Sequence, residues 1–215
     1  MARQARLARQ ARATVGVAEH GNSAVLVTIA HDGKCLDRRS IELTRDLPTH
    51  PYHHEGSWAV GRYLNSAWAK PVSLPDAIAL VETVREAATH GARAALEALA
   101  KAVPSPIARI AIRVCPPLPP TTEERIANSS AANIADSVMY RQALANAAEA
   151  RGWSVHWYDR ERVLREAAAT LRGEDIDAFL AAMGRSLGPP WQAKHKLAAA
   201  AALAARAQPA ARRAP

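Results

Sequence analysis

Residues 15–34, VGVAEHGNSAVLVTIAHDGK, contain two short apolar runs, each followed by a polar turn. The first run, residues 15–18, predicts a buried strand, and the β-branched run at residues 24–30 predicts a second one. The Asp32-Gly33 pair that follows is a strong hairpin signal, and a third strand is expected near residues 39–43. This stretch therefore predicts three antiparallel strands in meander order.

The elements after the meander favour a parallel extension of the same sheet. A long irregular stretch covers residues 44–74, and Ser73 near its end is a predicted helix N-cap. Thr121 and Glu124 form a predicted capping box at the start of a later helix. Helices are predicted over residues 75–102, 160–172, 174–187 and 191–206, and a helix that opens at Thr121 is expected to resume after residues 128–130 and to end at Gly152. Further strands are predicted over residues 107–114 and 153–158. Because the late strands alternate with helices, the order β-β-β-α-β-α-β-α predicts an α/β fold with a mixed five-stranded sheet flanked by helices.

The positive charge of the chain is concentrated at its two ends. The formal net charge is +8, but residues 1–13 contribute +4 and residues 194–215 contribute +5. The body is therefore near neutral. We predict a basic N-terminal tail at 1–13, a single α/β domain at 14–206 and a disordered C-terminal tail at 207–215. The basic tails favour nucleic acid as a partner, with an affinity that weakens as salt rises.

Composition also bears on the compartment. No apolar run is long enough to span a membrane, and the arginine-rich start lacks the apolar core of a signal peptide. An organelle transit peptide is the alternative for that start. Two cysteines, Cys35 and Cys115, are too few for a disulfide scaffold. We therefore expect a soluble, cytoplasmic protein with no membrane partner.

The topology resembles that of the ribonuclease H-like superfamily, and of its resolvase-like branch, over about residues 14–206. The stretch at residues 15–34 is similar to the first hairpin of that superfamily, where a strand ends in a catalytic acid before a glycine-containing turn. The resemblance implies two metal ions held by acids on the first strand, the fourth strand and a later helix. It also implies phosphodiester cleavage by a metal-activated water.

The residues at those three positions match the superfamily in part. Glu19 follows the first strand and corresponds to the first acid, one step late. The fourth strand ends in residues 113–115 (Arg-Val-Cys), and the last-helix position carries residues 194–196 (Lys-His-Lys). Two of the three expected carboxylates are therefore absent at the matching positions.

Other candidate residues lie near strand ends and on a helix. Glu19 and His20 follow a strand, a common place for ligand chemistry, and Asn22 in the same turn is a ligand-binding candidate. The alternative is a polar hairpin turn. Asp136 lies in the helix after the capping box and is a candidate second carboxylate, displaced from the fourth strand. A solvated helix face is the alternative for Asp136.

Three imidazoles and a carboxylate fall between positions 50 and 55: His50, His53, His54 and Glu55. Neutral imidazole together with carboxylate suits zinc, manganese or iron, so these side chains are candidate metal ligands. A substrate loop or a structural histidine cluster is the alternative.

Three polar residues open the last predicted helix. Helix N-termini attract anions, so Lys194 and Lys196 are candidate phosphate ligands and His195 is a candidate catalytic residue. A plain basic helix start is the alternative.

These patterns support three functional hypotheses. The preferred one is a ribonuclease H-like protein that binds nucleic acid or a phosphorylated ligand. Metal-dependent phosphodiester hydrolysis through Glu19, His20, Asp136 and His195 is its candidate reaction, with a divalent metal as the candidate cofactor. The alternatives are a non-catalytic scaffold that binds a protein partner and a histidine-dependent metalloenzyme acting on a small substrate. The preferred hypothesis requires Glu19, His20, His195 and residues 50–55 to meet at the rim of the sheet.

Overall fold

The structure is a computed structural model that describes residues 12–53, 72–171 and 173–207. Its strands are β1 Ala13–His20, β2 Ser23–Ile29, β3 Cys35–Glu42, β4 Ile107–Arg113 and β5 Ser154–Tyr158. The described helices are α3 Leu74–Ala102, α4 Thr122–Ala127, α5 Ser129–Ala150, α6 Val163–Ala168, α7 Ile176–Leu187 and α8 Ala193–Ala207.

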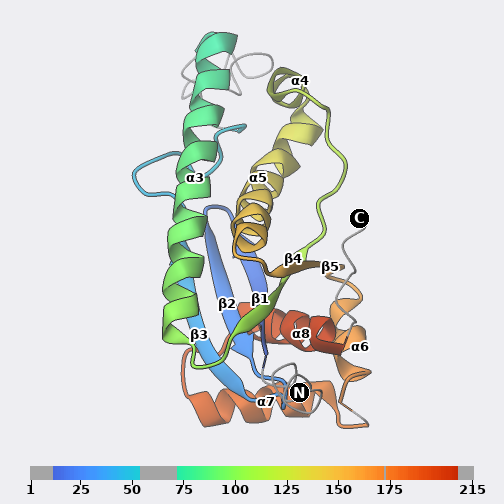
Figure 1. Cartoon of the computed structure of the whole chain (residues 1–215). Coiled ribbons are helices and arrows are strands. Elements are labelled where there is room, and N and C mark those ends of the chain that lie inside the picture. Colours follow the sequence, from blue (N-terminus) through green and yellow to red (C-terminus); the bar gives the residue numbers. More distant parts are fainter. Residues whose placement is uncertain (1–11, 54–71, 172, 208–215) are drawn as a thin grey trace, which may run out of the picture.

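The five strands form one mixed sheet in the order β3-β2-β1-β4-β5 (Figure 1). The pairs β1–β2 and β2–β3 are antiparallel, as the meander predicts. The pairs β1–β4 and β4–β5 are parallel, so β2 alone runs against the other four strands. This order and these directions are those of the ribonuclease H-like fold, and the predicted fold class is confirmed.

Local signals place the helix starts correctly. The Ser73 hydroxyl accepts a hydrogen bond from the Asp76 amide at the start of α3. Thr121 and Glu124 form both hydrogen bonds of the predicted capping box at the start of α4. Three elements differ clearly in length from prediction. β1 spans Ala13–His20, longer than the predicted residues 15–18, because residues 14–20 all pair with β2. β3 begins earlier than predicted, at Cys35, because Cys35 pairs with Ile29 directly after the turn. α6 ends earlier than predicted, because the backbone hydrogen bonds of residues 170 and 171 join residues three apart, as in a 3₁₀ turn.

The two faces of the sheet are covered by different helices (Figure 1). On β1, Val15 and Val17 pack against α3 and α5, whereas Ala18 packs against α8. This alternation follows from the two-residue period of a strand. The first layer buries Val84, Leu96 and Leu144, and the second layer is built mainly on the alanines of α8.

Helix α8 lies directly on β1, and Gly16 permits this contact. A Cβ atom at Gly16 would lie 1.8 Å from the Ala198 carbonyl oxygen and 2.7 Å from the Ala202 amide nitrogen. Residues 198–205 of α8 are all buried, and all but Leu203 are alanine. Small side chains on both surfaces therefore let the helix backbone approach the strand, which positions the amino end of α8 over the sheet.

Several predictions fall on residues that the structure does not describe. Residues 1–11, 54–71 and 208–215 are among these, so both predicted tails and the domain boundaries stay predictions. Within the described residues, no helix has the length and apolar character needed to cross a membrane. The compartment also stays a prediction.

Candidate functional site: the carboxyl edge of the sheet

The parallel strands β1, β4 and β5 end at the same edge of the sheet, at His20, Arg113 and Tyr158. We call this the carboxyl edge. Ligands of open α/β sheets commonly bind at such an edge. A side chain of α5, the segment at residues 44–53 and the start of α8 reach it from different parts of the chain.

Glu19, the predicted catalytic acid, forms a buried ion pair with Arg141 of α5. Arg141 Nε and Nη2 lie 2.7 and 2.6 Å from Glu19 Oε1. Arg141 Nη1 donates to the Val114 carbonyl oxygen over 2.8 Å. The Glu19 and Arg141 side chains are only 6% and 7% exposed. One guanidinium therefore neutralises Glu19 and joins β1, the end of β4 and α5.

Two weakly acidic groups lie beside this pair. The Tyr158 hydroxyl donates to the Val17 carbonyl oxygen over 2.8 Å, and burial, with the nearby Glu19 carboxylate, raises the pKa of Tyr158. Burial also raises the pKa of the Cys115 thiol, against the effect of the Arg141 charge. A thiol with a raised pKa stays protonated at neutral pH, so Cys115 is a poor nucleophile.

The residues at this point of the edge do not fit a divalent metal ion. The Glu19 carboxylate and the Val114 carbonyl oxygen would be the ligands, and the Arg141 guanidinium already contacts both. A fixed positive group at the same point repels a second cation. We therefore derive no reaction step through a metal at Glu19.

Asp136 is buried and contacts the predicted histidine segment. Asp136 Oδ1 accepts from the Tyr52 amide over 3.0 Å, and Oδ2 lies 3.2 Å from His53 Nδ1 and 3.7 Å from His50 Nδ1. The Asp136 side chain is 2% exposed. The alternative of a solvated helix face is therefore wrong for this residue. The carboxylate fixes residues 50–53 against α5.

Further hydrogen bonds hold the segment at residues 44–53 on the helices. The Tyr140 hydroxyl donates to the Thr49 carbonyl oxygen over 2.9 Å. The Asn22 amide donates to the Thr44 carbonyl oxygen over 3.0 Å. The side-chain amide of Asn22, a predicted ligand-binding group, thus joins the β1–β2 turn to the end of β3.

The metal prediction for residues 50–55 covers two positions, His54 and Glu55, outside the described residues. Within the described ranges, no three His, Cys, Asp or Glu side chains are arranged to hold a metal ion. A metal site at residues 50–55 therefore stays a prediction.

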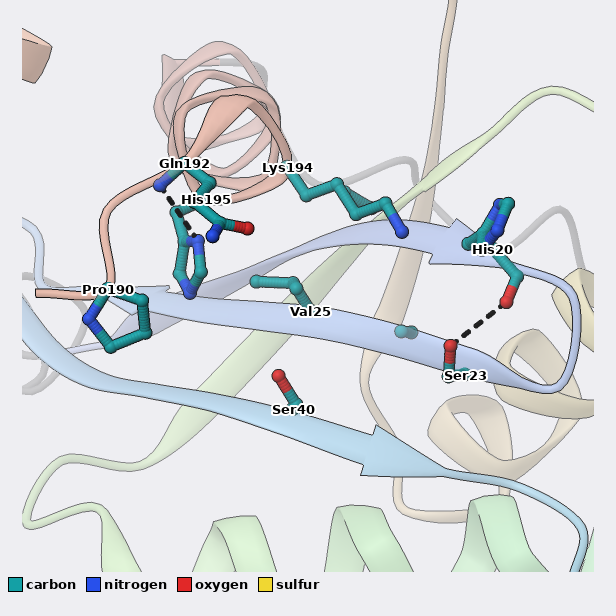
Figure 2. Close-up of a pocket in the computed structure, with 10 residues that line it drawn as sticks. His20, Ser23, Val25, Ser40, Pro190, Gln192, Lys194 and His195 are labelled. Atoms are coloured by element: carbon teal, nitrogen blue, oxygen red, sulfur yellow. Dashed lines mark hydrogen bonds between the residues drawn. The ribbon is translucent and has the colours of Figure 1, made fainter.

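A pocket of about 270 Å³ lies between the start of α8 and strands β1, β2 and β3 (Figure 2). Lys194 extends from α8 toward His20 at the end of β1, and the His195 ring points toward Val25 on β2 (Figure 2). The other polar side chains that line the pocket are Ser23, Ser40 and Gln192. Among the residues that the structure describes, none that lines the pocket is acidic, which leaves the pocket rich in hydrogen-bond donors.

His195 is 7% exposed and held in one orientation. Its Nδ1 accepts a hydrogen bond from the Gln192 amide over 3.2 Å, so in the neutral ring the proton lies on Nε2. Burial, with a smaller effect of the nearby Arg38 charge, lowers the pKa of His195. At neutral pH, His195 is therefore an uncharged donor through Nε2, whereas Lys194 supplies the positive charge.

Arg38 of β3 fixes the turn that precedes α8. Its two terminal nitrogens donate to four consecutive carbonyl oxygens, at 2.6 to 3.2 Å, from Leu187, Gly188, Pro189 and Pro190. Charge-assisted hydrogen bonds of this kind are among the stronger ones in proteins. The amino end of α8 is therefore anchored to the sheet by Arg38 as well as by the contact at Gly16.

The structure separates the predicted site residues into two groups. Glu19 and Asp136 bind partners on the α3–α5 side, and Gly21 lies close to His50 on the same rim. His20 and His195 line the pocket on the α8 side. Consecutive strand residues point to opposite faces, so Glu19 and His20 diverge although they are neighbours. The expected meeting of all these residues at one place is therefore not observed.

Two arginines of the site were missed from the sequence. Arg141 lies in a helix where a basic residue usually indicates a solvated face, and its partner Glu19 is 122 residues away. Arg38 lies on an edge strand and bonds carbonyl groups about 150 residues later in the chain. No local pattern in the sequence predicts either contact. The one available signal is that two arginines, Arg38 and Arg39, are adjacent within a predicted strand.

Comparisons with known proteins find similar solved structures. A structure of RuvC from Thermus thermophilus in complex with a Holliday junction substrate has a TM-score of 0.46 and 12% identity, and the match covers 90% of this chain and 91% of that one. A second Thermus thermophilus RuvC structure has a TM-score of 0.43 and 13% identity, with coverage of 89% and 92%. No family model matches the chain, and no curated protein matches it.

Proposed function

We propose that this chain is a ribonuclease H-like domain that binds the phosphate backbone of a nucleic acid at its carboxyl edge, without hydrolysing it. The pocket formed by His20, Ser23, Ser40, Gln192, Lys194 and His195 is the proposed phosphate site. Its composition carries the proposal, because every polar side chain that lines it in the described part of the chain can donate a hydrogen bond and none of these is a carboxylate.

The position of the pocket adds to this argument. The first amides of α8 have no acceptor within the helix, and the helix dipole favours an anion at that end. Lys194 supplies a full charge beside these amides, and the buried His195 presents its Nε2 donor. A phosphate oxygen can accept several such bonds at once.

The surrounding charge favours a polymer over a single phosphate group. Lys196 lies on the neighbouring surface of α8, where Arg160 and Arg185 line adjacent hollows. Asp177 is the acidic residue among the side chains that line these two hollows. The two basic ends of the sequence add further positive charge. Repeated phosphates would use several of these cations at the same time.

We propose that the chain does not hydrolyse nucleic acid because Glu19 is paired with Arg141. A metal-dependent mechanism needs a carboxylate free to bind an ion, and Glu19 is buried against a guanidinium. Asp136 is likewise committed to the Tyr52 amide and His53. These contacts favour nucleic-acid binding without hydrolysis over metal-dependent cleavage.

The test is binding of labelled single-stranded and duplex DNA and RNA, measured by fluorescence anisotropy over a salt series. We expect affinity to fall as salt rises from about 50 to 200 mM. Lys194→Ala should weaken binding to all sequences alike and reduce the slope of log affinity against log salt by about 1. Lys34→Ala is the matched control, because Lys34 is an exposed lysine in the β2–β3 turn at the opposite edge.

Three results would contradict the proposal. The first is equal loss of affinity in Lys194→Ala and Lys34→Ala, which would mean diffuse attraction without a site. The second is binding of a phosphorylated small molecule but of no nucleic acid. The third is cleavage of any of these nucleic acids with Mg²⁺ or Mn²⁺ that is lost in Glu19→Gln.

A further inference from the structure

A second hollow, of about 320 Å³, lies beside the proposed phosphate site, between the start of α8 and helices α6 and α7. Of the described residues that line it, half are apolar: Leu164, Leu180, Ala193 and Leu197. The others are charged: Arg160, Asp177, Lys194 and Lys196. A hollow of this size with apolar walls and a few charged groups is typical of a site for a small organic group.

Lys194 connects the two sites, because it lines this hollow as well as the proposed phosphate site. A phosphate bound at Lys194 therefore has the hollow as its neighbour. Each phosphate of a nucleic acid is joined through a sugar to a base, so a base is the group that can enter the hollow. The charge of the hollow suits this ligand, since three cations outnumber one carboxylate and attract the flanking phosphates.

The side chains of the hollow favour a base over an acyl chain. Leu164 on α6 is a large apolar side chain that is 43% exposed, and the flat face of a base would cover it. The guanidinium plane of arginine, here Arg160, is a group on which unpaired bases stack. An ionised carboxylate such as that of Asp177 only accepts hydrogen bonds, and the exocyclic amines of adenine, cytosine and guanine donate them. An acyl chain has no donor for Asp177.

We propose that this hollow binds an unpaired nucleobase with an exocyclic amine, next to the phosphate held at Lys194. In a duplex the bases are stacked and their amines are paired, so a base reaches the hollow only by leaving the helix. Single-stranded nucleic acid is therefore the preferred ligand. This inference rests on the proposed nucleic-acid binding and deepens it by naming the class of nucleic acid.

The test is fluorescence anisotropy on the full chain with labelled oligodeoxycytidine, oligothymidine and a duplex of the same length. Oligodeoxycytidine should bind more tightly than the duplex, and about 5-fold more tightly than oligothymidine, which has no exocyclic amine. Leu164→Ala should weaken oligodeoxycytidine binding about 5-fold, at the low end for a base contact because leucine is not aromatic, and leave duplex binding unchanged. Asp177→Ala should remove the preference for cytosine over thymine.

Ile134→Ala is the matched control, because Ile134 is 38% exposed on α5, in the other helix layer. It should bind all three ligands as the wild type does. Ala193→Leu, which fills the hollow from an exposed position on α8, should have the same effect as Leu164→Ala, so the test does not depend on one variant.

The possible failures are distinguishable. Equal affinity for oligodeoxycytidine and the duplex overturns the base site but leaves the proposed phosphate binding standing, as does a single-strand preference that neither Leu164→Ala nor Ala193→Leu reduces. Displacement of the labelled strand by decanoate but not by cytidine monophosphate would assign the hollow to an acyl chain and overturn the base site. If no nucleic acid binds at all, the proposed function and this inference fail together.

Discussion

Substitution of Gly16 by alanine tests the packing that positions the α8 pocket. The added Cβ would lie 1.8 Å from the Ala198 carbonyl oxygen and 2.7 Å from the Ala202 amide nitrogen, both backbone atoms. Close carbon–oxygen contacts in proteins are about 3.3 Å, so α8 would have to retreat by about 1.5 Å. Overpacking costs about 1–3 kcal/mol, and a clash with backbone belongs at the upper end. We expect about 3 kcal/mol of lost stability, or a Tm lower by about 6–12 °C.

The assay is thermal and urea denaturation followed by circular dichroism. Gly152→Ala is the control, because Gly152 has a φ of 76° but no atom of the described residues within 4 Å of an added Cβ. Its left-handed backbone should cost only about 1 kcal/mol. The retreat of α8 should also move Lys194 and His195 away from His20, so nucleic-acid affinity should fall in Gly16→Ala alone. A Gly16→Ala protein at least as stable as Gly152→Ala would refute the described contact.

Three further predictions concern buried polar groups. Asp136→Ala should cost roughly 1–3 kcal/mol and increase hydrogen exchange in residues 44–53, because the hydrogen bonds from the Tyr52 amide and His53 to the Asp136 carboxylate are removed; unchanged exchange there would contradict this role. Burial raises the pKa of Tyr140 to about 12. Since an unfolded tyrosine ionises near pH 10, stability should fall between about pH 10 and 12, by about 1.4 kcal/mol per pH unit for this group, and urea titrations of Tyr140→Phe should show a shallower fall. Burial lowers the pKa of His156, whose buried Nε2 has no hydrogen-bond partner among the described residues. The neutral ring is therefore favoured in the fold, and stability should be lost as pH falls below about 6.5. His156→Phe should reduce that acid sensitivity in the same urea assay, and an unchanged acid profile would show that His156 has no part in it.

Local chemistry explains why the fold could be predicted. The run Ala24 to Ile29 is β-branched and apolar, and Thr121 with Glu124 marks a helix start, so each signal acts within a few residues. Such signals set the type and order of the elements. The order then limits the sheet to few topologies, because parallel strands need helical crossovers.

The candidate site depends on contacts that no local signal encodes. Arg141 looks like a surface residue in the sequence, yet it is buried against Glu19 from a distant strand. Asp136 has the spacing of a solvated position, but residues 50–53 cover it. The tertiary fold places Glu19 beside Arg141 and the Tyr52 amide beside Asp136, and these partners determine that the buried charges hold the fold together. Lys194 and His195, which the sequence places at a helix start, line the pocket at α8, but the strands that form its other side come from the tertiary fold.

The hold of Arg38 on the turn before α8 has a kinetic consequence. Four peptide oxygens that would repel an approaching anion are turned toward β3 instead. Because Arg38 already fixes that turn, binding of a phosphate at the proposed site should require no rearrangement of residues 187–190. The association rate constant should be set mainly by diffusion and long-range electrostatic attraction. Differences in affinity among ligands should then arise mainly from their dissociation rate constants.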